Sequence, residues 1–221
     1  MEALAEAEVL EAEAPQEAGK KNRYFEVINY RTITLETGFF IKFEKSPFFL
    51  KTLVVFAHPY LEYSYSNRLL INFYERHQHY DFLDLYETYP DFHIAAFKER
   101  KRLAGYDRFV FHFPIIWFGM PPLLRLWIDE VFDGNWIKMG VNNPFENKPI
   151  YILATTRSKK RSFGREGKHH YTVDELISGL IVTLRAFKGE IKETFVVYEA
   201  ENLTKKDIIQ YKQQFIETLG D

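Results

Sequence analysis

The chain has 221 residues, of which 46% are hydrophobic and 17% aromatic, so it can form one sizeable buried core. Its 29 Lys and Arg residues nearly balance 31 Asp and Glu residues, which excludes the strong positive field that holds a nucleic-acid backbone. We expect no nucleic-acid partner. The absence of cysteine excludes disulfides, cysteine-ligated metals and a cysteine nucleophile, and it favours a reducing compartment.

Residues 1–21 open with a low-complexity stretch of Glu and Ala that has few large apolar side chains. Such a stretch buries too little surface to fix itself in place, so we predict an acidic, flexible tail. It lacks the basic start and apolar run of a secretory signal. The most apolar stretch, Phe109–Leu124, is too short to span a bilayer and is broken by prolines. We therefore expect a cytoplasmic protein.

Residues 22–49 are predicted to form a β-hairpin. Val27–Arg31 and Phe39–Phe43 are rich in β-branched and aromatic residues, they flank Glu36–Gly38, and Pro47 follows them. The hairpin is either an accessory element laid over the edge of the main domain or an interaction module, and we favour the accessory role.

Residues 50–221 alternate between short apolar runs and amphipathic segments. The predicted strands are Thr52–Ala57, Tyr80–Leu85, Arg108–Phe113, Pro149–Thr155 and Thr194–Tyr198, and the predicted helices are Asn67–His77, Ile94–Ala104, Leu123–Phe132, Val173–Phe187 and Leu203–Leu219. Thr172 and Glu175 form a capping box, Gly189 ends that helix, and Asn202 or Thr204 caps the last one. The alternation predicts an α/β fold, with a doubly wound, five-stranded parallel sheet that binds ligands at the carboxyl ends of its strands.

The first predicted strand leads into a loop, His58–Asn67, that is rich in hydroxyl groups. Hydroxyls and free backbone N–H groups beside a helix start favour the binding of an anion such as phosphate. The loop has neither a dinucleotide-binding nor a P-loop glycine pattern. The alternative is that Ser66 is only an N-cap and that the other polar residues are ordinary loop residues.

The third predicted strand leads into an apolar, aromatic loop, Pro114–Pro122, that contains three prolines. Such a loop is unusual as a solvent-facing turn and is typical of a wall for a flat aromatic ligand. Alternatively, Trp117 and Phe118 fold into the core or lie in a dimer interface.

The fourth predicted strand leads into a basic loop, with six Lys and Arg residues between Arg157 and Lys168. This loop either recognises phosphate or is simply solvated. His169 and His170 are adjacent, so their side chains point in different directions, and no carboxylates accompany them. We expect no metal site.

The order and spacing of three segments resemble the flavodoxin-like NAD(P)H:quinone oxidoreductase family. The segments are Ala57–Asn67, Leu85–Phe92 and Pro114–Phe132. Within the family the chain is most similar to the FMN-containing ancillary subunits of glutathione-regulated potassium-efflux systems. The strong similarity runs from Lys51 to Gly140, a weaker one continues to the end of the chain, and nothing before Ser46 is covered.

The resemblance implies a homodimer that binds FMN rather than FAD, takes electrons from NAD(P)H and reduces quinones by ping-pong hydride transfer. It implies that the FMN phosphate and ribityl chain are held by residues of the first loop, His58, Ser64, Tyr65, Ser66 and Asn67. The isoalloxazine would be lined by residues of the second loop, Ile115, Ile116, Trp117 and Phe118. The cofactor site would be completed by Thr155, Thr156, Arg157 and Ser158, and His169 would be catalytic.

Three departures from the family pattern surround this site. Arg157 and Ser158 stand where the family has two glycines, Phe163 stands where it has a tyrosine, and a tyrosine is lost within Asn135–Gly140. Arg157 either points outward, where it can meet the 2'-phosphate of NADPH together with Lys159, Lys160 or Arg161, or inward, where it blocks the flavin ring. We expect reduced turnover and a preference for NADPH.

The sequence therefore predicts an FMN-dependent NAD(P)H oxidoreductase acting on quinones or similar electrophiles. We expect a dimer because Trp117, Phe118, Trp127 and Trp136 concentrate aromatic surface in one region. The alternative function is a regulatory subunit of a potassium-efflux system with weak or no redox activity, which a channel partner would hold at the inner membrane.

Overall fold

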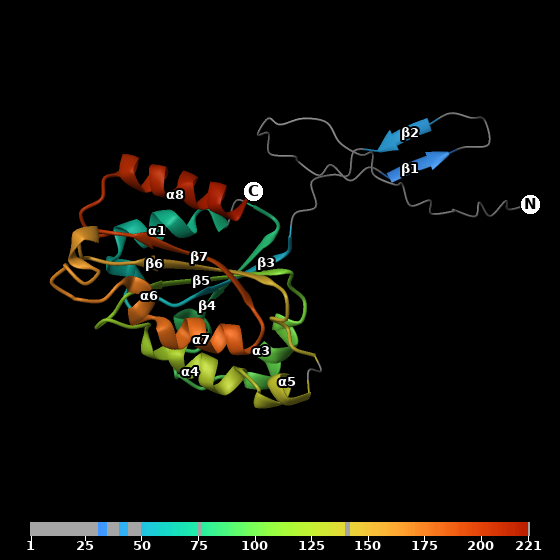
Figure 1. Ribbon diagram of the computed structural model, residues 1–221, viewed down its shortest axis with the longest axis horizontal. Coiled ribbons are helices and arrows are strands. Elements are labelled where there is room, and N and C mark those ends of the chain that lie inside the picture. Colours follow the sequence, from blue (N-terminus) through green and yellow to red (C-terminus); the bar gives the residue numbers. More distant parts are fainter. Residues whose placement is uncertain (1–30, 35–39, 44–49, 75–76, 140–141, 221) are drawn as a thin grey trace, which may run out of the picture. The chain divides into compact units, whose positions relative to one another are not determined.

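The computed structural model describes residues 31–34, 40–43, 50–74, 77–139 and 142–220 (Figure 1). The chain divides into two compact units, Met1–Phe48 and Phe49–Asp221. The predicted acidic tail, residues 1–21, lies outside the described residues. No helix in the described ranges combines the length and the apolar character that crossing a bilayer requires.

The first unit contains a pair of antiparallel strands, β1 (Arg31–Thr34) and β2 (Phe40–Phe43). Arg31 pairs with Phe43, and Thr34 pairs with Phe40. This pairing confirms the predicted hairpin. The first strand, however, overlaps the predicted Val27–Arg31 only at Arg31, and both residues 27–30 and the predicted turn at Glu36–Gly38 lie outside the described residues.

The second unit is built on a five-stranded, fully parallel sheet in the order β4-β3-β5-β6-β7. The strands are β3 (Thr52–Phe56), β4 (Tyr80–Asp84), β5 (Arg108–Pro114), β6 (Pro149–Thr155) and β7 (Glu190–Val197). The predicted doubly wound α/β fold is confirmed, and the first four strands end within one residue of their predicted limits.

The central strands are apolar because helices cover the sheet on both faces. In Figure 1, α1 and α8 lie on one face, and α3, α4, α5 and α7 lie on the other. Every residue of β3 and the first six residues of β5 are buried. One face contributes a core around Val54 and Val110 with α1 and α8, and the other a core around Leu53 and Phe111.

The last strand, β7, begins four residues earlier than predicted, at Glu190 rather than Thr194. It lies at the edge of the sheet, so several of its early side chains reach solvent and the segment Glu190–Glu193 is largely polar. A prediction based on continuous apolar character misses such residues.

The helices follow the predicted alternation, with differences at their ends. Their bounds are α1 (Tyr65–Ile71), α2 (Leu85–Thr88), α3 (Ala96–Leu103), α4 (Pro122–Val131), α5 (Gly134–Met139), α6 (Val173–Leu176), α7 (Ser178–Ala186) and α8 (Lys205–Leu219), with short 3-10 turns at Leu61–Tyr63 and Lys160–Ser162. The sequence analysis missed α2 and α5. Helix α1 ends earlier than the predicted Asn67–His77 and begins two residues sooner.

The predicted helix Val173–Phe187 is in fact two helices, because Ile177 departs from helical geometry, with φ -105 and ψ 15. The capping box of Thr172 and Glu175 is confirmed, and so is Thr204 as the cap of α8. Helix α7 ends at Ala186, three residues before the predicted stop at Gly189. Lys188 takes the positive φ of 59, and a Cβ at Gly189 would lie 2.4 Å from Ile150 Cδ1, so a larger residue there would force that side chain to move.

Candidate functional site

The predicted site residues lie at the carboxyl ends of β3, β5 and β6, in the three loops that follow these strands, in the first turn of α1 and at the end of β6. These strands are adjacent in the sheet, and parallel strands bring their carboxyl ends to one edge. The loops are residues 57–64, 115–121 and 156–172. Ile115 N–H donates to the Thr155 carbonyl at 2.8 Å, so the second loop leaves the sheet directly beside the end of β6.

In the first loop, Ser64 is the N-cap of α1, because its Oγ accepts from the Asn67 backbone N–H at 3.4 Å. The alternative interpretation, in which Ser66 is the N-cap, is therefore wrong. Ser66 is buried, and its hydroxyl donates to the carbonyl of Ala200. Tyr65, at the first position of α1, is exposed.

His58 begins the same loop and is held as a neutral side chain. Its Nδ1 accepts from the Tyr60 backbone N–H at 3.2 Å. Burial lowers the pKa of His58 to about 4, although the Glu62 carboxylate opposes this shift. At neutral pH His58 therefore brings no charge to the loop.

Asn67 connects the first loop to the end of β6 through its buried side-chain amide. Asn67 Nδ2 donates to Ser64 Oγ at 2.8 Å and to Thr155 Oγ1 at 3.2 Å. Three residues predicted at the cofactor site, Ser64, Asn67 and Thr155, are thus joined at one nitrogen atom, although Thr155 lies 88 positions after Asn67.

Two residues that the sequence analysis missed complete this connection. His112 Nε2 lies 3.0 Å from Asn67 Oδ1, and Tyr74 OH lies 3.2 Å from His112 Nδ1. Both side chains are buried. The only sequence signal was a single histidine inside the apolar run of β5, because a polar side chain at a buried strand position must find a partner.

The second loop is a tight turn whose two central residues are aromatic. Ile116 and Gly119 exchange backbone hydrogen bonds of 2.9 and 3.0 Å around Trp117 and Phe118. The central residues have φ values of 46 and 66, a left-handed conformation that is costly for bulky side chains. Trp117 is 92% exposed and Phe118 is 52% exposed.

The prediction that four aromatic residues share one dimer surface is wrong for two of them. Trp127 and Trp136 are buried in the core of the second unit, since they lie on the inner sides of α4 and α5. Trp117 and Phe118 remain exposed. Ile115 and Ile116, which precede them, are half-buried.

In the third loop, the Arg157 side chain points outward. It is 83% exposed and its Nε lies 2.5 Å from Glu201 Oε1. Arg157 does not have a positive φ, so it does not need the conformational freedom of a glycine. Lys159 pairs with Glu199 at 3.7 Å, so two of the six bases are held by acidic neighbours.

His169 lies where the second and third loops meet. Its Nε2 is 3.1 Å from Ser158 Oγ, and its ring contacts Phe118 and Phe163 at centroid distances of 5.2 and 5.1 Å. Ser158 N–H donates to Thr156 Oγ1 at 3.2 Å, which orients the start of the loop. The predicted catalytic histidine is thus in contact with two other residues predicted at the site, Ser158 and Phe118.

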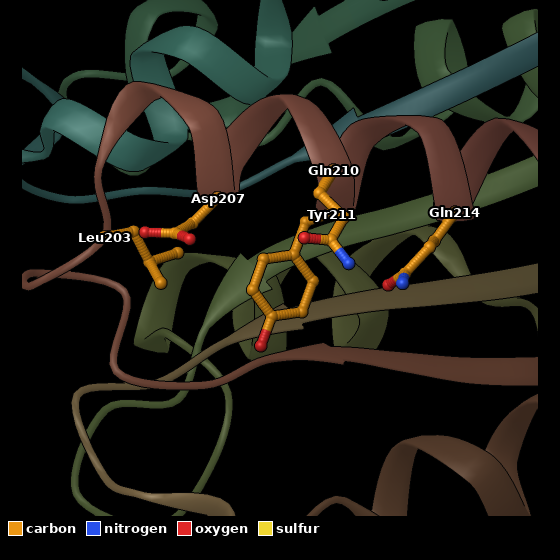
Figure 2. A pocket seen from close by; sticks show the side chains of 5 residues that line it. All are labelled: Leu203, Asp207, Gln210, Tyr211 and Gln214. Atoms are coloured by element: carbon orange, nitrogen blue, oxygen red, sulfur yellow. The ribbon is translucent and has the colours of Figure 1, made fainter.

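A cavity of about 280 Å³ lies elsewhere, along α8. Figure 2 shows its lining side chains, Leu203, Asp207, Gln210, Tyr211 and Gln214. Asp207 already accepts hydrogen bonds from Thr204 in the capping box of α8. None of the predicted site residues lines this cavity, so we assign it no part in the chemistry.

A family model described as a flavodoxin-like fold matches residues 50–219. General stress protein 14 of Bacillus subtilis is 30% identical over 159 residues, which is 72% of this chain and 91% of that protein. An NAD(P)H oxidoreductase of the same organism, named YrkL and described as uncharacterized, is 28% identical over 170 residues, covering 77% of this chain and 98% of the relative.

The crystal structure of general stress protein 14 from Treponema denticola, in complex with FMN, has a similar fold. It is 22% identical, with a TM-score of 0.68, and the match covers 77% of this chain and 96% of that one. Together with the five-stranded parallel sheet, these matches show that the chain belongs to the flavodoxin-like NAD(P)H oxidoreductase family.

Proposed function

We propose that this protein is an FMN-dependent NAD(P)H oxidoreductase that reduces quinones or similar electrophiles. The observation that carries the proposal is the meeting, at one edge of the sheet, of the Ser64 and Thr155 hydroxyls with the exposed Trp117–Phe118 turn. The FMN complex of the Treponema denticola protein and the oxidoreductase name of the Bacillus subtilis relative support it.

The chemistry of these side chains fits FMN. Ser64 and Thr155 each accept from Asn67, so their hydroxyl protons remain available to phosphate oxygens. The aromatic turn offers apolar surface to a flat ring system. Arg157 pairs with Glu201 and is mostly exposed, so its side chain points outward. Bound FMN would supply hydride chemistry, taking reducing equivalents from NAD(P)H and passing them to the quinone in two separate half-reactions.

His169 is the proton-handling residue in this proposal. Its Nε2 shares a hydrogen bond with Ser158 Oγ, and Phe118 and Phe163 hold its ring between them. Such a constrained imidazole can hold a proton at a fixed position and release it to an acceptor. Phe163 has no hydroxyl to assist, so Ser158 is the polar partner of the histidine.

A preference for NADPH over NADH is part of the proposal. Glu201 and Glu199 engage Arg157 and Lys159. Further along the same loop, Lys160 and Arg161 are exposed. Guanidinium and ammonium groups are suited to the 2'-phosphate that distinguishes NADPH.

We also propose a homodimer in which a second copy covers the exposed turn. Trp117 and Phe118 present more aromatic surface to solvent than an isolated subunit normally leaves uncovered. Light scattering at micromolar concentration should give twice the 26.3 kDa mass of one chain. A monomer would contradict the proposed dimer.

A regulatory role as an ancillary subunit of a potassium-efflux channel is the second candidate. It is favoured by Phe163, which packs against His169 but cannot transfer a proton. This role would place the protein at the inner membrane through its partner, and it requires no quinone turnover.

Experiments on one preparation of the purified protein distinguish the enzyme from the regulatory subunit. The purified full-length protein should be yellow or turn yellow with added FMN, and it should oxidise NADPH when menadione is supplied. A colourless protein that binds no FMN in a titration would contradict the enzyme. Binding of FMN without turnover in the wild-type protein would favour the regulatory role.

A further inference from the structure

The orientation of the Asn67 side-chain amide decides what the neighbouring hydroxyls can offer a ligand. Asn67 Nδ2 faces Ser64 Oγ and Thr155 Oγ1, while Oδ1 faces His112. With the amide turned by 180°, Oδ1 would face the two hydroxyls and accept their protons. In the observed orientation they accept from Asn67 and keep their own protons.

His112 selects between the two orientations. An amide oxygen can only accept, so the 3.0 Å contact to Asn67 Oδ1 requires that His112 Nε2 carries the proton. His112 Nδ1 is then an acceptor, and it faces Tyr74 OH at 3.2 Å. A histidine protonated at Nδ1 instead would favour the turned amide.

Burial keeps both His112 and Tyr74 in a single protonation state. It lowers the pKa of His112 to about 3, and the nearby His58 adds to the shift, so the imidazole is neutral with one N–H. It raises the pKa of Tyr74 well above 10, so the phenol always has a proton to donate. Hydrogen bonds therefore run in one direction, from Tyr74 to His112 to Asn67 and on to the hydroxyls.

The last step leaves Ser64 with only a donor function. Its Oγ accepts from Asn67 Nδ2 at 2.8 Å and from the Asn67 backbone N–H at 3.4 Å, which occupies both lone pairs. Thr155 Oγ1 accepts from the same Nδ2 at 3.2 Å. Among the described residues, neither hydroxyl has an acceptor for its proton.

We infer that Tyr74 and His112 are positioning residues that hold the Asn67 amide so that the hydroxyls of Ser64 and Thr155 donate to the phosphate of FMN. The identity of the ligand rests on the proposed function. Tyr74 and His112 touch neither cofactor nor substrate in this arrangement. They act through Asn67, and they act on the phosphate rather than on the ring.

Comparing FMN with riboflavin tests this inference, because riboflavin lacks the phosphate. Dissociation constants are measured by flavin fluorescence with the full-length protein. His112→Leu removes the Nε2 proton and should weaken FMN binding by about tenfold or more, since a hydrogen bond to a charged group is worth at least that factor. Riboflavin binding should not change. His112→Gln, whose amide can still donate to Asn67 Oδ1, should restore most of the FMN affinity.

Two further variants sharpen the test. Tyr74→Phe removes the bond that fixes the tautomer, so it should weaken FMN binding less than His112→Leu does. Tyr106→Phe is the matched control, because its hydroxyl bonds to Asp81 at 2.7 Å near the amino end of β5. It should leave both flavin affinities unchanged.

A measurement without ligand keeps the inference falsifiable if His112→Leu does not fold. Long-range ¹H–¹⁵N NMR spectra of the wild-type protein should show His112 protonated at Nε2. An Nδ1-protonated tautomer, or equal losses of FMN and riboflavin affinity in His112→Leu, would overturn the inference. A wild-type protein that binds neither flavin would instead overturn the proposed function, and the tautomer would still be measured in the same sample.

Discussion

Two buried polar networks lie on strand β5, and they end differently. Arg108, near the amino end, donates to Thr52 Oγ1 at 2.8 Å, to the Leu219 carbonyl at 2.9 Å and to Tyr80 OH at 3.1 Å, and Thr52 in turn donates to the Leu50 carbonyl. His112, near the carboxyl end, leads through Asn67 to the hydroxyls of Ser64 and Thr155. Two branches of the first network end on backbone carbonyls, at Leu219 and Leu50, whereas the second network ends on hydroxyls that keep their donors.

The difference separates a structural role from a binding role on one strand. Arg108 and His112 are an even number of positions apart, so both face the layer of α1 and α8, and both are almost fully buried. A buried network that ends on backbone carbonyls satisfies polar groups within the fold and so stabilises it. A network that leaves donors at the carboxyl edge of a parallel sheet is poised for an anionic ligand.

The largest expected effect is on stability, when the first network loses Arg108. Arg108→Met should lower the free energy of unfolding by about 4 kcal/mol, because it leaves buried acceptors without a donor. Urea denaturation measures the loss. Arg125→Met is the control, since Arg125 is an exposed partner of Asp129 and should change stability by less than about 0.5 kcal/mol. Similar losses in both variants would contradict the structural role of Arg108.

Changes to the second network, at Ser64 and Thr155, should affect FMN binding more than stability. Ser64→Ala combined with Thr155→Val removes two donors to a charged phosphate, so the FMN dissociation constant should rise about a hundredfold. The loss of the Ser64 cap should lower the free energy of unfolding by only about 1 kcal/mol. Unchanged FMN affinity, measured by fluorescence titration, would refute the assignment of these hydroxyls.

The two networks should also differ in their response to acid. The folded-state pKa of His112 is about 3, below the unfolded value of 6.5. The unfolded chain therefore takes up the proton first, and the stability that His112 contributes above pH 6.5 is lost as the pH falls from 6.5 toward 3. Between pH 6.5 and 5 the loss should be about 2 kcal/mol.

Denaturation at several pH values measures this dependence, and His112→Gln should flatten it. His58 titrates in the same direction, with a folded-state pKa of about 4, so part of the slope should remain in the variant. A slope identical to that of the wild type would show that His112 is not the buried neutral group described above.

The sequence predicted the strands and loops that form this site, but not the hydrogen bonds between them. The strands β3, β5 and β6 are buried on both faces, so their apolar runs were visible, and the loops after them could be located. The role of His112 depends on a contact with Asn67, 45 positions away, that no local pattern encodes. For the same reason the sequence could not show that Trp127 faces the core while Trp117 faces solvent.

Left-handed backbone conformations could not be predicted from the sequence pattern either. The sequence analysis identified Pro114–Pro122 as an aromatic loop, but not that Trp117 and Phe118 would both take a left-handed conformation. Glycine or asparagine is the usual residue at such positions, so an aromatic pair gives no turn signal. The same limit explains why the sequence did not indicate that Lys188, rather than Gly189, has the positive φ after α7.

The smallest effect concerns strain in the aromatic turn, where the Trp117 side chain is 92% exposed and adds little to the core. Trp117→Gly and Trp117→Ala both remove the indole, so both should weaken FMN binding to the same extent. Only glycine accepts a φ of 46 without a steric penalty, so it should be the more stable variant by about 1 kcal/mol. Thermal unfolding of the two proteins without ligand measures the difference. Equal stabilities would mean that the turn relaxes when the ring is lost, whereas the expected difference would show that the protein maintains a strained backbone to present an exposed aromatic side chain in the loop after β5.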